Sequence, residues 1–330
     1  MLIVNLRTFF TPLAIAQRLQ ALPPIKSPTM DLIFPARTQH PLAVLGVDEI
    51  SEVALTIPVV RRGSPSTPVV TDSREIMYIE PQPFRPSTTL TAVDLNNFKL
   101  LDNSGKDVWV SAKMDMLRRI VHRSTEALCA QALSGTIAYP VKLQGGGWDS
   151  YQVIFGTPQS YTLDKAWDDN AAKITDVFKT FTDMQVLLQD AGYGGQVEIW
   201  AGKIAFYGLM ALAEKVTSTA KIRVEMSAEG VFVGNYLVKL RAENYKNPET
   251  GLFVQIVADD KIVMVAQDAN HRLFYCAVDD LDANLVPMPF FVKPIKMEDP
   301  SGIKLVAESK PLPVPVPKAI CWAQVTNVQA

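Results

Sequence analysis

The stretch that decides the fold is Asp107–Gly135, DVWVSAKMDMLRRIVHRSTEALCAQALSG. Apolar residues recur through it at helical spacing, and they line one side: Val110, Leu117, Val121 and Leu128, with Trp109, Ile120 and Ala127 beside them. No proline interrupts the run, and Gly135 can take the left-handed conformation that ends a helix. The spacing therefore predicts one amphipathic helix over residues 107–134, longer than a usual globular helix.

The opposite side of this predicted helix is polar. It carries Asp115, Arg119, His122 and Glu126. Asp115 precedes Arg119 by four residues, so the two make an opposite-charge pair in the favourable order. A polar helix side of this kind is normally solvated, and we expect the same here.

Length and charge limit the classes of protein that fit. The chain has 330 residues, 48% of them hydrophobic and 20% charged, which is enough for one large or two ordinary domains. A net charge of −2 argues against a general nucleic-acid binder, which would carry a basic field. The same charge permits a protein that lies near a polyanion without adhering to it.

Cysteine usage and hydropathy indicate where the protein is made. Cys129, Cys276 and Cys321 are isolated from one another, so we expect no disulfide framework and a reducing, cytoplasmic site of synthesis. The apolar N-terminus lacks the order of segments of a signal peptide. An uncharged apolar run of about 18 residues is also missing, so we expect no membrane span.

Residues 1–47 have the pattern of an arm. Thr11 followed by Pro12 predicts the start of a short helix, and Pro23–Pro24 predicts its end. One face of that helix would be formed by Leu13, Ala16, Leu19 and Leu22. So short a stripe cannot form a core alone, so it must pack on the main body or on another subunit.

Residues 49–84 have the pattern of a long two-stranded ribbon with a polar tip at residues 61–73. Four arginines in or beside the ribbon give it a positive balance: Arg61, Arg62, Arg74 and Arg85. An isolated ribbon is only marginally stable, so this one would gain order by lying on a neighbour. An ordinary surface hairpin with solvated arginines is the alternative.

The chain after the long helix predicts an α+β domain. Residues 136–156 form two strands around the glycine turn at 145–147, and helices follow at 168–192 and 203–216. Asp169 or Asn170 is the expected cap of the first of these helices. Further strands follow, and prolines at 311, 313, 315 and 317 keep the chain extended before a last strand at 319–325.

The sequence shows little sign of catalytic chemistry. Its histidines, His40, His122 and His271, lack zinc-ligand spacing, and nucleotide-binding and hydrolase motifs are missing. The acid pairs at 259–260 and 279–280 lie beside strand ends, where acids serve most often as turn residues. We therefore expect no enzyme, no cofactor and no metal, and keep a metal-dependent enzyme using the paired acids as the weakest alternative.

The closing segment, DPSGIKLVAESKPLPVPVPKAICWAQV (residues 299–325), carries a family resemblance. Asp-Pro, a strand, Ser-x-Pro-Leu-Pro and a final strand resemble the C-terminal signature of the lambda-type phage capsid protein E family. The lead-in FFVKPIKMEDP and the strand at Val153–Gly156 are similar as well. The resemblance extends from about Leu32 to Val325, and it implies the HK97-type fold of tailed-bacteriophage major capsid proteins.

The resemblance implies a role for each segment. It implies an N-terminal arm (1–47), an extended E-loop hairpin (48–86), a peripheral domain with a spine helix (87–167, helix 107–134), an axial domain (168–286) and terminal peripheral strands with the C-terminus (287–330). Arg61, Arg62, Arg74 and Arg85 would then lie at a subunit interface. The polar side of the long helix would face the shell interior or a neighbouring subunit.

The implied function is that of a major capsid protein, which is structural and not an enzyme. Pentamers and hexamers of the chain would form an icosahedral shell around double-stranded DNA, without sequence-specific binding and without a membrane. The shell would be assembled in the host cytoplasm and found in the virion, with decoration, scaffold and portal proteins as possible partners. We expect no covalent crosslink, because the tip at 61–73 contains no lysine. An encapsulin-like compartment shell is the alternative of the same fold.

Overall fold

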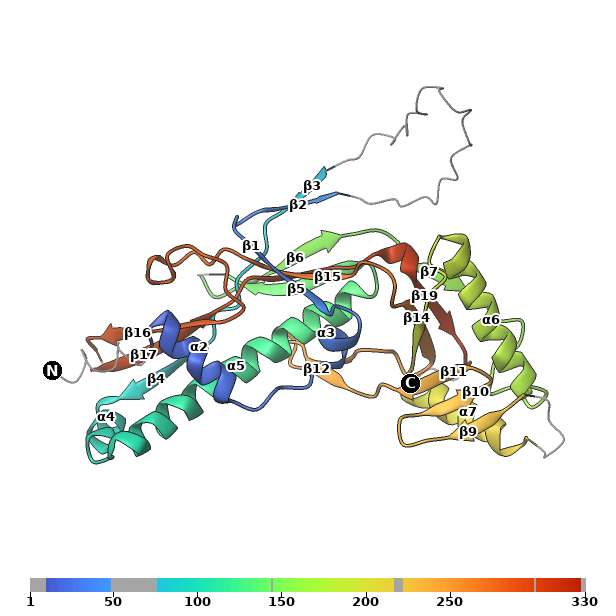
Figure 1. The fold of residues 1–330 in the computed structure, drawn as a ribbon, viewed down its shortest axis with the longest axis horizontal. Helices are drawn as coiled ribbons and strands as arrows, with labels where there is room; N and C mark the ends of the chain where they lie inside the picture. The colour runs from blue at the N-terminus through green and yellow to red at the C-terminus, as the bar shows by residue number, and fades with distance from the viewer. Residues whose placement is uncertain (1–9, 49–75, 144, 217–221, 300, 328–330) are drawn as a thin grey trace, which may run out of the picture. The chain divides into compact units, whose positions relative to one another are not determined.

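The computed structural model describes residues 10–48, 76–143, 145–216, 222–299 and 301–327. Figure 1 shows their helices and strands. These elements divide between two compact units, each with its own hydrophobic core. The first unit comprises residues 1–46, 78–129 and 272–314, and the second comprises residues 47–77, 130–271 and 315–330.

The first unit is organised around the long helix α5 (Asn103–Ala132), which it contains as far as Cys129. Its other helices are α2 (Pro12–Ala21), α3 (Pro28–Leu32), α4 (Ala92–Lys99) and the 3₁₀ turn η1 (Leu281–Ala283). One antiparallel sheet has the order β16 (Phe291–Met297), β17 (Gly302–Glu308), β4 (Ser87–Thr91). A second sheet has the order β1 (Ala36–His40), β15 (Arg272–Cys276), β18 (Pro311–Val314), with β1 parallel to β15.

The long helix predicted over 107–134 is present, and it runs from Asn103 to Ala132. Val110, Leu117 and Val121 are buried in the core of the first unit, as the spacing predicts. Ile120 was expected beside them, but its side chain is 44% exposed because the buried stripe is narrower than predicted. Gly135 follows the helix with φ of 77°, and its N–H donates to the carbonyl of Ala132 at 2.9 Å.

The arm helix α2 begins at the predicted place. The Thr11 hydroxyl accepts a hydrogen bond from the N–H of Ala14 at 3.3 Å. The predicted apolar face was wrong, since Leu13 is 70% exposed and Ile15 is buried in the first unit's core. A ten-residue helix offers two competing apolar stripes, and its packing beside β16 selects the one that contains Ile15 and Leu19.

The second unit contains a seven-stranded mixed sheet. Its order is β7 (Gln159–Tyr161), β19 (Ile320–Gln324), β14 (Lys261–Ala266), β8 (Val197–Ala201), β11 (Tyr236–Leu240), β10 (Val231–Val233), β9 (Val224–Met226). Two-stranded sheets are formed by β5 (Thr136–Lys142) with β6 (Trp148–Ile154), by β12 (Asn244–Lys246) with β13 (Phe253–Gln255), and by β2 (Leu45–Asp48) with β3 (Ile76–Ile79). The sequence analysis grouped residues 287–330; β16–β18 belong to the first unit, whereas η2 (Pro317–Ala319) and β19 belong to the second.

Two helices, α6 (Ile174–Asp190) and α7 (Lys203–Glu214), pack on this sheet. Alternation along the strands sends one set of side chains toward them. Cys321, Met264, Ile199 and Val238 are paired across neighbouring strands and belong to the same buried cluster as the helix residues Phe181 and Leu209. The sheet side that carries Ile199 is therefore the helix-covered side.

The start of α6 corrects one predicted cap. Lys173, not Asp169 or Asn170, occupies the position before the helix, and the Asp176 carboxylate accepts from the Lys173 N–H at 2.9 Å. Asp169 instead accepts from the N–H of Ala171 at 2.8 Å and orders the preceding turn. Several polar residues in a row compete for the cap, and the sequence alone does not rank them.

A buried histidine in the second unit generates a pH prediction. His271 accepts a hydrogen bond at Nδ1 from the N–H of Val316 at 3.1 Å, and burial lowers the pKa of His271 from 6.5 to about 4. Folding therefore favours the neutral imidazole, so this contribution to stability is fully present above pH 6.5 and is lost as the pH falls toward 4.

Between pH 7 and pH 5, we expect the free energy of unfolding to fall by about 2 kcal/mol more in the wild type than in His271→Asn. Urea titration of the unassembled chain at both pH values measures this difference. An equal fall in the two proteins would contradict the assignment.

Candidate assembly surface on the long helix

The polar side of α5 holds a segment of the N-terminal arm. The carboxylate of Glu126 accepts hydrogen bonds from the backbone N–H of Thr29 at 2.7 Å and of Met30 at 3.0 Å. Both N–H groups lie in the first turn of α3, where a helix offers no internal partner. A side chain of α5 therefore caps α3, in the place where a residue just before a helix usually does so.

Two further side chains of α5 contact the same segment. His122 Nδ1 lies 3.0 Å from the hydroxyl of Ser27. Arg118 donates to the carbonyl of Pro23 at 2.7 Å and is itself held by Asp115 at 2.9 Å. We call the contacts of Arg118, His122 and Glu126 with residues 23–30 the arm clasp. Its three α5 residues are four positions apart, so they lie on one side of the helix.

The arm clasp is shielded from solvent. Ser27, Thr29 and Met30 are buried. Burial raises the pKa of Glu126, against the opposing effect of its hydrogen bonds from Thr29 and Met30. Burial, together with the charges of Arg37 and Arg118, lowers the pKa of His122.

The expectation of a solvated polar side was therefore wrong for His122 and Glu126. The arm residues bind through main-chain N–H and C=O groups, which leave no signal in the sequence. The signal that was available is the proline spacing at 23, 24 and 28, which keeps the segment extended beside the helix.

The structure places one of the four predicted interface arginines. Arg85 pairs with Glu308, with Nε 2.9 Å from Oε2, and the Arg85 side chain is 52% exposed while that of Glu308 is 3% exposed. Arg61, Arg62 and Arg74 lie outside the described residues. Arg85 thus already has a partner within its own chain and still presents half of its surface to solvent.

The acid pairs have structural partners. Asp279 pairs with the buried Lys310 at 2.7 Å, and Asp280 pairs with Lys293 at 2.5 Å while capping η1. In the other pair, main-chain carbonyls of Asp259 and Asp260 accept hydrogen bonds from Ala205 and Val325. Across the described ranges, no group of three or more His, Cys, Asp and Glu is placed to hold a metal ion.

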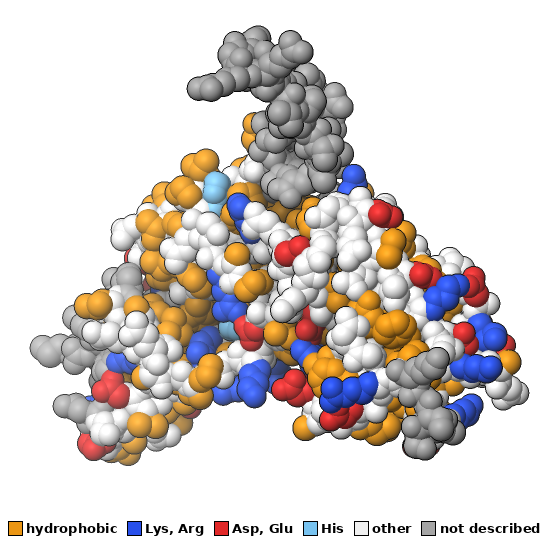
Figure 2. Space-filling model, turned by 45° about the vertical axis from the view of Figure 1, so that its right-hand side comes forward, with side chains coloured by type: hydrophobic (Ala, Val, Ile, Leu, Met, Phe, Trp, Pro, Cys, Tyr) orange, Lys and Arg blue, Asp and Glu red, His pale blue; other side chains and the backbone are white. Residues whose placement is uncertain are grey.

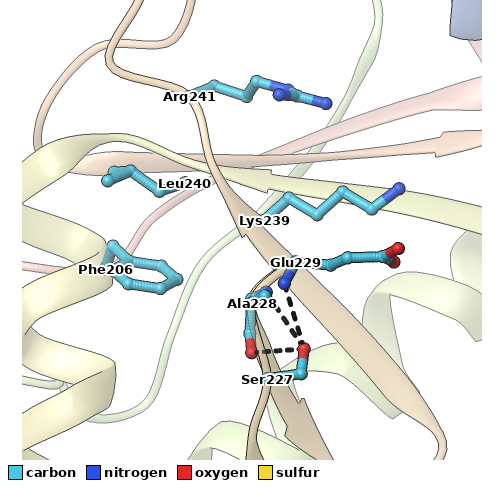
Figure 3. Close-up of a pocket in the computed structure, with 8 residues that line it drawn as sticks. Phe206, Ser227, Ala228, Glu229, Lys239, Leu240 and Arg241 are labelled. Carbon is cyan, nitrogen blue, oxygen red and sulfur yellow. Dashed lines mark hydrogen bonds between the residues drawn. The ribbon is translucent and has the colours of Figure 1, made fainter.

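A hollow of about 640 Å³ lies in the second unit, beside the turn between β9 and β10 (Figure 3). Figure 3 shows Lys239 and Arg241 pointing to one side of β11, with Phe206 and Leu240 on the other. Lys239 pairs with the buried Glu198 at 2.7 Å, and the Arg241 guanidinium lies 4.9 Å from the centre of the Trp200 ring. These cations are engaged within the chain, so we assign the hollow no ligand. The sequence analysis missed this charged cluster, although Glu198 and Trp200 alternate on one side of a buried strand.

Loss of the Glu126 carboxylate tests the arm clasp. We expect Glu126→Ala to leave two N–H groups of α3 unpaired, at a cost of about 1–3 kcal/mol, and to loosen the segment around Lys26. Trypsin should then cut after Lys26 roughly tenfold faster or more, as judged by mass spectrometry of the fragments. Glu214→Ala, at the exposed end of α7, is the matched control, and equal cleavage of the two variants would argue against the clasp.

Comparison with known proteins gives these elements a family. Residues 11–325 match the sequence profile of the phage major capsid protein E family. No curated protein sequence matches the chain. The described residues include no helix long and apolar enough to cross a membrane.

Two solved structures share the fold over most of the chain. The putative capsid protein of a prophage of E. coli CFT073 is 12% identical with a TM-score of 0.57, covering 90% of this chain and 92% of that one. A phage-related protein from Bordetella bronchiseptica RB50 is 10% identical with a TM-score of 0.53, covering 97% and 98%. The predicted HK97-type fold is thereby confirmed. The chain belongs to the phage major capsid protein E family.

Proposed function

We propose that this chain is the major head protein of a tailed phage and self-assembles into the icosahedral shell around its double-stranded DNA. The observation that carries the proposal is the family match over residues 11–325. The shared fold of the prophage capsid protein supports it. Proteins of this kind are structural, so the chain's work is to make repeated contacts between copies, not to turn over a substrate.

Exposed apolar groups of the subunit suit such contacts. Leu281 is 83% exposed and Leu285 is 53% exposed, in a loop of the first unit. Asn284 and Leu285 both have φ of 55°, which is uncommon for a leucine and costs conformational energy. In the second unit, Phe253 is 71% exposed at the β12–β13 hairpin. Copies packed around symmetry axes would bury such groups against one another.

The E-loop (48–86) would make a different kind of contact. Its base is the pair of strands β2 and β3, and the pairing of Arg85 with Glu308 fixes the chain that leaves it. Arg61, Arg62 and Arg74 would pair with carboxylates of an adjacent subunit, since arginine binds a carboxylate through two parallel hydrogen bonds. The exposed half of Arg85 would join them.

The remaining roles follow from the shell. The peripheral domain (87–167 and 287–330) would contain α5 as its spine, and the axial domain (168–286) would meet its copies in pentamers and hexamers. The shell would be assembled in the host cytoplasm and found in the virion. Portal, scaffold and decoration proteins are the partners that such a shell can take.

Negative-stain microscopy of the purified wild-type chain tests the proposal directly. We expect roughly spherical particles of uniform size that sediment far ahead of the free subunit. A chain that stays monomeric or dimeric over a wide range of salt and protein concentration would contradict the proposal.

Removal of two E-loop arginines tests the interface. We expect Arg61→Ala with Arg62→Ala to lower the yield of particles, because charge-assisted contacts between neighbours are lost. Lys203→Ala with Lys215→Ala removes the same charge from exposed positions outside the E-loop and should leave the yield unchanged. Equal yields from the arginine variant and the wild type across a range of salt would refute the role of these arginines.

A further inference from the structure

The near-neutral charge of the whole chain conceals a local excess of positive charge. Residues 18–37 and 103–132, which form the arm segment and α5, contain eight basic and four acidic residues. The basic ones are Arg18, Lys26, Arg37, Lys106, Lys113, Arg118, Arg119 and Arg123. Against a net charge of −2 for the chain, these segments carry +4 and the rest carries −6.

All four acids of these segments are engaged. Asp107 pairs with Arg18, Asp115 with Arg118 and Arg119, Asp31 with Arg37, and Glu126 with two backbone N–H groups. Within the part of the chain that the structure describes, Lys26 and Arg123 are exposed and form no ion pair. Arg119 and Arg37 keep 50% and 40% of their side-chain surface exposed despite their partners.

These cations lie close together on the first unit. Arg37 and Arg118 are near enough to His122 to lower its pKa, and Lys26 adjoins Ser27, which contacts the same histidine. Arg119 and Arg123 are one helical turn apart on α5. We call Lys26, Arg37, Arg118, Arg119 and Arg123 the basic patch. Figure 2 shows Lys and Arg side chains gathered beside a histidine on one face of the molecule.

We propose that the basic patch contacts the phosphates of the packaged double-stranded DNA. This inference rests on the proposed function, since it assigns the patch to the inner surface of the shell. The duplex presents a dense row of negative charges, and neutralising them releases bound counterions without reading any base. The arm clasp fixes the backbone on both sides of the patch, so little order has to be gained on binding.

The patch also explains how a protein of net charge −2 can meet DNA without coating it. Only a few phosphates per copy would be neutralised, and the remaining negative charge repels further duplex. Contacts of this strength, repeated over many copies, would order the outermost DNA and still release it.

The test compares Lys26→Gln/Arg119→Gln/Arg123→Gln with Lys142→Gln/Lys203→Gln/Lys246→Gln, three exposed lysines of the second unit. The probe is a short fluorescent DNA duplex of mixed sequence, titrated with unassembled full-length protein between about 50 and 200 mM salt. Each lost phosphate contact removes about 0.9 from the slope of log Kobs against log salt, so the patch variant should lose roughly 2 to 3 and the control nothing.

Equal slopes for the patch variant and the control would overturn the proposal. A patch variant that keeps DNA binding but loses binding to a polyglutamate peptide would also overturn it, in favour of an acidic protein partner. Arg123→Gln alone, which touches no described partner, guards against misfolding and should lower the slope by about 0.9.

Particle formation separates this inference from the proposed function. A patch variant that forms normal particles but binds duplex weakly supports both. If neither it nor the wild type forms particles, the proposed function fails, and the slope still decides whether the patch binds DNA.

Discussion

A buried carboxylate sets the order of the first unit. Glu126 takes the two free N–H groups of α3, at 2.7 and 3.0 Å, in a site from which water is largely excluded. A carboxylate in such a place is costly unless its oxygens are hydrogen-bonded, so folding of the helix and docking of the arm depend on each other. The arm is thus a part of the subunit, joined to α5 on the side away from the core.

The long helix therefore serves two surfaces at once. Its apolar stripe, with Val110, Leu117 and Val121, supports the sheet of β4, β16 and β17, while its polar side supports the arm. A helix of 30 residues is long enough to do both and to leave charged groups between them. In a shell, the same helix would position arm, core and basic patch relative to the subunit's neighbours.

Much of this fold could be predicted from the sequence, because period and turn chemistry are local. The helix at α5, the glycine that ends it, the hairpin of β5 and β6, and the family itself all followed from residue patterns. Long-range choices could not be predicted. Whether α2 buries Leu13 or Ile15 depends on what it packs against, and the arm clasp joins side chains to main-chain groups roughly 100 residues away. Net charge likewise gave no hint that positive groups gather around His122.

The central claim is that α5 holds the arm in the unassembled subunit, and amide hydrogen exchange tests it most directly. Exchange of the peptides that span residues 23–34 would be followed by mass spectrometry in the wild-type chain before assembly. The account predicts that the amides of Thr29 and Met30 exchange slowly, on the time scale of the core of α5. Exchange at the rate of a free peptide would contradict it.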